Sequence, residues 1–147
     1  MADYSGPLQD VASVIELAVA PVFLLTGLGT TLSVLSARLA RIVDRARVLV
    51  DRLAQAGPPE DGALRSELRL LDLRRRRINM AITSGVSSAL FVCVLIASAF
   101  IGAMVGVDTS LAVATLFVLA MFAFIAALLL FLSEIILAVR STRMDVL

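Results

Sequence analysis

The sequence predicts an all-α integral membrane protein with three transmembrane helices, the first and second of which extend into an antiparallel cytoplasmic coiled-coil hairpin. Hydrophobic residues make up 60% of the chain and its mean hydropathy is +0.99, whereas soluble domains are roughly 45–50% apolar. Long uncharged runs are separated by two arginine-rich segments, residues 38–77 and 140–143. Cytoplasmic loops concentrate basic residues beside their spans, so both segments are predicted to lie in the cytoplasm.

The first predicted span covers about residues 11–37, which is long enough to cross a hydrocarbon core that needs about 20 helical residues. Glu16 and Pro21 interrupt it near its outer end. The segment before it lacks the basic region of a cleavable secretory signal and contains Asp3 and Asp10 instead. We therefore expect this span to be retained, with the N-terminus outside.

The predicted hairpin arm, residues 38–77, contains eleven of the thirteen arginines and six acidic residues, a net charge of +5. The positions predicted to make the contact between the two arm helices, which we call the seam, alternate at spacings of four and three, as in a coiled coil. They are Leu35, Leu39, Ile42, Ala46, Leu49 and Leu53, followed by Leu64, Leu68, Leu71, Arg75, Ile78 and Ile82. Glycine and proline in residues 57–62 predict the reversal between the two helices. Taking residues 38–56 as its first helix, at about 1.5 Å per residue, the arm extends roughly 28 Å from the membrane.

The second and third predicted spans cover about residues 78–105 and 111–139. The short turn at residues 106–110 makes them antiparallel, and residues 140–147 form a cytoplasmic tail. All these elements belong to a single membrane domain.

Several classes of chemistry are disfavoured by the residues present. The chain has no histidine and a single cysteine, Cys93, so it lacks the commonest general base and metal ligands. We predict no catalytic residues, no metal, no cofactor and no enzymatic activity. Acidic residues interleaved with the arginines of the arm indicate a solvated, ion-paired surface, not a nucleic-acid site. Arg74, Arg75, Arg76 and Arg77 adjoin the second span, where they either fix the topology or bind an anionic lipid.

One face of the first span has the mixed character expected of a pore lining. Steps of four and three from Glu16 place seven residues on one helical stripe: Glu16, Ala20, Phe23, Gly27, Thr30, Val34 and Arg38. A ring of acidic side chains at the outer mouth of an oligomer selects cations. In the alternative interpretation, Glu16 reaches the headgroups or caps a helix, and Gly27 and Gly29 with the neighbouring threonines form a close helix-packing surface.

The other two spans contain further polar candidates. Asn79, Thr83 and Ser87 form an i, i+4 row that either joins helices by hydrogen bonds or lines a hydrophilic path. Glu134 lies near the cytoplasmic end of the third span, where an acid needs a partner. The candidate partners are Arg38, Arg76, Arg77 and Arg140, and the alternative is an ion-coupling role. At the base of the arm, Arg41, Asp44 and Arg45 are predicted to form an ion-pair network.

Four segments together resemble a family of small bacterial three-span membrane proteins known as a domain of unknown function. They are APVFLLTGLG at residues 20–29, RLARIVDR at 38–45, RRINMAI at 76–82 and FLSEI at 131–135. The likeness extends over about residues 14–140 and implies a bacterial inner-membrane protein without assigning an activity. In that family the position of Ser133 is often basic, which directs attention to arginines on the other spans as partners of Glu134.

Two functional hypotheses follow from these observations. The leading one is a homo-oligomeric, cation-conducting pore, because three spans are too few to enclose a hydrophilic path in one subunit and small chains commonly assemble symmetrically. The alternative is a non-conducting membrane scaffold or accessory protein that binds a cytoplasmic partner through the arm.

Overall fold

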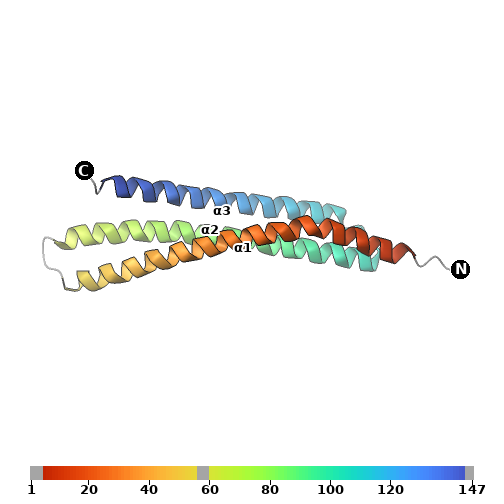
Figure 1. The fold of residues 1–147 in the computed structure, drawn as a ribbon, viewed down its shortest axis with the longest axis horizontal. Coiled ribbons are helices and arrows are strands. Elements are labelled where there is room, and N and C mark those ends of the chain that lie inside the picture. The colour runs from red at the N-terminus through yellow and green to blue at the C-terminus, as the bar shows by residue number, and fades with distance from the viewer. Residues whose placement is uncertain (1–4, 56–59, 145–147) are drawn as a thin grey trace. The chain divides into compact units, whose positions relative to one another are not determined.

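The computed structural model describes residues 5–55 and 60–144, with only the backbone described at residues 5–14, 17, 60–61 and 139–144. These residues form three α-helices and no strands: α1 (Ser5–Leu53), α2 (Glu60–Val105) and α3 (Ser110–Met144) (Figure 1). Each helix contains a stretch long and apolar enough to cross a membrane, namely Ala18–Leu53, Gly62–Val105 and Ser110–Ala138. The prediction of an all-helical chain with three helices long and apolar enough to span a membrane is therefore confirmed.

Helix α1 is continuous from the first span into the arm segment, and Pro21 lies within it without ending it. The predicted reversal differs at its far end, because Glu60, Asp61 and Gly62 already belong to α2. The rest of that reversal, residues 57–59, lies outside the described residues.

The described chain divides into two compact units. In the unit formed by Leu32–Thr83 with the chain from Ala126 onward, α1 and α2 run antiparallel (Figure 1). Its buried cluster takes Leu35, Ile42 and Leu49 from α1, at intervals of seven residues, and Leu71, Ile78 and Ala81 from α2. Leu130 and Phe131 of α3 pack against the same cluster.

The burial pattern of α2 differs from the predicted seam at one position. Arg75 is exposed, whereas Arg74 is largely buried, with 24% of its side chain accessible. The buried residues Leu71, Ile78 and Ala81 continue through Arg74 at spacings of three, four and three. The rotation of α2 therefore turns Arg74 toward the other helices and Arg75 toward the outside.

The other unit contains the chain up to Thr31 together with Ser84–Ile125. Pro21 and Leu28 of α1 are buried here, as are Ser88 of α2 and Ala120 of α3. The Ser88 hydroxyl donates a hydrogen bond to the Ala120 carbonyl at 2.7 Å. This bond joins α2 to α3 and satisfies a buried polar group, as hydroxyls between membrane helices commonly do.

The turn between α2 and α3 is closed by a glycine-dependent cap. Gly106 has a φ of 72°, and the Val107 N–H donates to the Gly102 carbonyl at 3.0 Å, which is the Schellman arrangement at a helix C-terminus. Asp108 accepts hydrogen bonds from the hydroxyl and the N–H of Ser110, and these bonds lower the pKa of the Asp108 carboxyl. The start of α3 is thereby fixed at Ser110.

Candidate functional site

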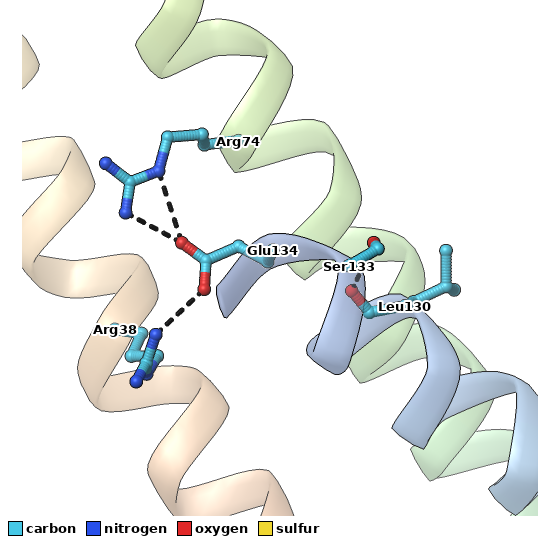
Figure 2. Close-up of polar contacts among 5 residues, drawn as sticks. All are labelled: Arg38, Arg74, Leu130, Ser133 and Glu134. Carbon is cyan, nitrogen blue, oxygen red and sulfur yellow. Dashed lines mark hydrogen bonds and ion pairs between the residues drawn. The ribbon is translucent and has the colours of Figure 1, made fainter. Parts of the chain in front are cut away.

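A buried carboxylate joins the three helices of the second unit. Glu134 of α3 is 1% exposed and lies between Arg38 of α1 and Arg74 of α2 (Figure 2). Arg38 donates from Nη1 to Glu134 Oε2 at 2.9 Å. Arg74 donates from Nη2 and Nε to Glu134 Oε1 at 2.7 and 3.2 Å. We call these three residues the Glu134 clamp.

Local packing positions each member of the clamp. The Arg38 guanidinium lies over the ring of Phe131, 5.2 Å from its centroid, which is within the range of a cation–π contact. Arg74 stands between the buried residues Leu71 and Ile78 along α2. The Ser133 hydroxyl donates instead to the Leu130 carbonyl of its own helix at 2.7 Å (Figure 2), so the residue next to Glu134 contributes nothing to its neutralisation.

The structure describes the side chains of three of the four predicted partners of Glu134, and one of them contacts it. Arg38 contacts it, but Arg76 donates from Nε to Asp72 Oδ2 at 3.1 Å on its own helix. Arg77 is half-buried and forms no ion pair with any described residue. The side chain of Arg140 lies outside the described part of the chain. Arg74, which the sequence suggested only as a lipid ligand or topology determinant, is the second partner.

The ion-pair network predicted among Arg41, Asp44 and Arg45 at the base of the arm does not form between these residues in the described structure. Asp44 is exposed and pairs with neither Arg41 nor Arg45. Arg45 instead donates from Nε and Nη2 to Glu67 Oε1 of α2, at 3.0 and 2.8 Å. Both side chains of this pair are well exposed, 50% and 41%, so it stabilises the arm by no more than about 1 kcal/mol. Sequence reasoning missed it because the loop length alone does not fix which residues of α1 and α2 face each other.

A polar cavity of about 350 Å³ opens beside the clamp. Its lining is mainly charged and consists of Arg38, Arg41, Ile42, Arg45, Leu71, Arg74 and Glu134. Arg41 makes no hydrogen bond or ion pair with any residue that the structure describes. Four arginines and one glutamate therefore line a common space.

Six of the seven pore-lining candidates of α1 are exposed, whereas the seventh, Arg38, contacts Glu134 of α3. Glu16, Ala20, Phe23, Gly27, Thr30 and Val34 are all exposed, and Arg38 is half-buried. The neighbouring apolar stripe is packed instead, with Pro21, Leu28 and Leu35 buried. Gly27 and Gly29 have open space where a side chain would begin, so no helix in this chain packs closely on them.

Polar groups on the exposed faces are satisfied within their own helices. Thr30 donates to the Thr26 carbonyl at 3.1 Å and Thr31 to the Gly27 carbonyl at 2.9 Å. In the α2 row, Thr83 donates to the Asn79 carbonyl at 2.9 Å; both residues are exposed and Ser87 is half-buried. These hydroxyls need no partner on another helix, so the two polar rows remain available to lipid, water or a second chain.

Comparison with known proteins identifies a family but no activity. Residues 18–144 match the family model described as Protein of unknown function (DUF2721). No curated protein and no solved structure matches the chain. The match covers the exposed stripe of α1 from Ala18 onward and all three members of the Glu134 clamp.

Proposed function

The chain belongs to the DUF2721 family of proteins of unknown function, and from that premise we propose that it is a homo-oligomeric, cation-conducting pore of the bacterial inner membrane. In this proposal the N-terminus is outside and the arm and C-terminus are cytoplasmic, because the arginines concentrate at the arm and near the C-terminus. The arm is an antiparallel coiled coil, supported by the seven-residue spacing of Leu35, Ile42 and Leu49 in the buried cluster. The chain is not an enzyme.

One observation carries the pore proposal: the mixed stripe of α1 is exposed from Glu16 to Val34, while the apolar positions Pro21, Leu28 and Leu35 on the adjacent face are buried. A single chain leaves Glu16, Gly27 and Thr30 without packing partners, and a ring of subunits brings them to a shared axis. Glu16 then supplies an acidic ring at the outer mouth, which favours cations. Large exposed side chains on α3, such as Phe122, Leu129 and Leu132, are suited to contact lipid or an adjacent subunit.

Replacing Glu16 with glutamine is expected to reduce cation selectivity without abolishing conduction. A carboxylate about 4 Å from a passing ion in water contributes about 1 kcal/mol, so the cation-to-anion permeability ratio should fall by about fivefold. The measurement is the reversal potential across bilayers containing the purified protein under a salt gradient.

Asp108→Asn is the matched control for Glu16→Gln, because Asp108 is an exposed acid in the α2–α3 turn, outside the α1 stripe. It should leave the permeability ratio unchanged. Equal shifts in the two variants would remove Glu16 from the pore mouth. Equal ion flux in empty and protein-loaded vesicles would reject conduction itself.

The scaffold alternative is favoured by a different observation, the apolar surface of the arm. Val48, Val50, Leu70 and Leu73 are between 45% and 54% exposed, and an open groove of about 530 Å³ runs beside Val50 and Leu68. Exposed apolar groups of this kind on a charged helical pair are suited to bind a partner helix.

Photo-crosslinking from Val50 in native membranes distinguishes the two functions. For the pore we expect adducts only at multiples of the 15.6 kDa chain mass, since the arms of neighbouring subunits contact each other. A discrete adduct of another mass would support the scaffold. The same photoreactive group at Leu129, an exposed residue of the α3 span, reports the background of non-specific membrane contacts.

A further inference from the structure

We propose that the cavity beside the Glu134 clamp is a binding site for a phosphate-bearing anion, supplied either by an acidic lipid headgroup or by a soluble phosphate. The site is formed by Arg38, Arg41, Arg45 and Arg74, with Glu134 as its single acidic lining residue. This inference concerns a ligand and does not depend on whether the protein conducts ions.

The charges around the cavity leave an excess of positive charge. Glu134 is shared by Arg38 and Arg74, so one of these two guanidinium charges is not neutralised. Glu67 neutralises Arg45 from outside the lining, and Arg41 has no partner among the described residues. The resulting excess of two positive charges matches an anion of charge between −1 and −2, the range of phosphate esters near neutral pH.

Free donors are present on the same side chains. A guanidinium has five N–H donors, of which Arg38 uses Nη1 and Arg74 uses Nη2 and Nε for Glu134. Arg38 Nη2, Arg74 Nη1 and the whole of Arg41 remain for a ligand. Planar, forked donors of this kind are suited to bidentate contacts with phosphate oxygens.

The cavity has a fixed framework and an adequate size. Glu134 holds two of the arginines in place before any ligand arrives, and Phe131 supports the Arg38 guanidinium. A volume of about 350 Å³ lies within the roughly 300–1,000 Å³ typical of small-molecule sites. The Glu134 carboxylate is already occupied by two cations, so its repulsion of an incoming anion is largely offset.

The position along the helices suits a ligand at a membrane surface. Arg38 directly follows the uncharged residues 17–37 of α1, and Arg74 is four residues before the apolar part of α2 begins at Ile78. On α3, Glu134 is the first charged residue after Asp108. On α1 and α2 the cavity thus lies where apolar residues give way to charged ones, and on α3 it lies at the one charged residue near the end of the predicted span. This is close to the level of lipid headgroups for a spanning helix.

The test uses the full-length protein purified in a non-ionic detergent. Native mass spectrometry measures adducts with dioleoyl phosphatidic acid, dioleoyl phosphatidylglycerol and dioleoyl phosphatidylcholine, and calorimetry measures the binding of inorganic phosphate. Arg41→Gln is the informative variant, because Arg41 is exposed and its loss breaks no contact in the described structure. The control is Arg69→Gln, which removes the same charge from an exposed position on α2 that lies outside the cavity lining.

We expect Arg41→Gln to weaken anion binding at least fivefold and Arg69→Gln to change it less than twofold. Binding of the two acidic lipids without inorganic phosphate identifies a headgroup as the ligand, whereas Arg41-dependent binding of inorganic phosphate identifies a soluble anion. The proposal is overturned if the two variants weaken binding equally, if phosphatidylcholine binds as tightly as the acidic lipids, or if none of the probes binds.

Discussion

Replacing Arg38 and Arg74 together with glutamine is expected to destabilise the protein by about 3–5 kcal/mol, more than the two single substitutions combined. Each single variant leaves one guanidinium on Glu134 and should cost about 1 kcal/mol. The double variant leaves a carboxylate that is 1% exposed without a cation. The expected coupling between the two sites is therefore about 1–3 kcal/mol. The measurement is the free energy of unfolding from denaturant titration in mixed micelles.

Two further variants control the clamp experiment. Arg75→Gln with Arg76→Gln removes the same charge from exposed neighbouring positions and breaks only the exposed Arg76–Asp72 pair, so its cost should stay near 0.5 kcal/mol. Adding Glu134→Gln to the Arg38 and Arg74 double variant removes the buried charge and should restore part of the lost stability. Strictly additive single and double effects would show that the two arginines do not share the neutralisation of Glu134.

Replacing Leu49 with alanine is expected to destabilise the protein by about 2–5 kcal/mol, and replacing Leu28 with alanine by much less. Both leucines lie in α1 and are 1% exposed, so they are a matched pair. Leu49 belongs to the proposed cytoplasmic arm, where its burial removes apolar surface from water. Leu28 belongs to the span, where the alternative environment is lipid and only the packing contribution is lost.

The same denaturant titration measures the leucine pair, and lipid-to-detergent ratio serves as an additional variable. A similar loss of stability in both variants would place Leu49 in an apolar environment and contradict a water-exposed arm. Val48→Ala is the surface control in the arm, because Val48 is 45% exposed; it should change the stability by less than about 0.5 kcal/mol.

The helical architecture was predictable because its signals are local. Long apolar runs predict the spans, and the interval of seven residues between Leu35, Ile42 and Leu49 predicted which side of α1 is buried. The acid within the third span also indicated a need for a basic partner, and Arg38 is one. These inferences required only the period of a helix and the cost of an unpaired charge in an apolar environment.

The second partner of Glu134 was harder to predict because it depends on the rotation of α2 about its axis. Four consecutive arginines point in four directions, each about 100° from the last. The buried residues Leu71, Ile78 and Ala81 settle the rotation and select Arg74. The spacing of three, four and three through these positions is visible in the sequence, but so is the competing seam through Arg75. Burial against α1 and α3 decides between them.

The Glu134 clamp also has a consequence for the order in which the protein assembles. Arg38 and Arg74 precede the carboxylate they share by 96 and 60 residues, so both are synthesised before it. Until Glu134 of α3 has been made, the two guanidinium groups lack the counter-charge that they share in the folded structure. We therefore expect the contact among the three helices at this level to form only after α3 has been synthesised.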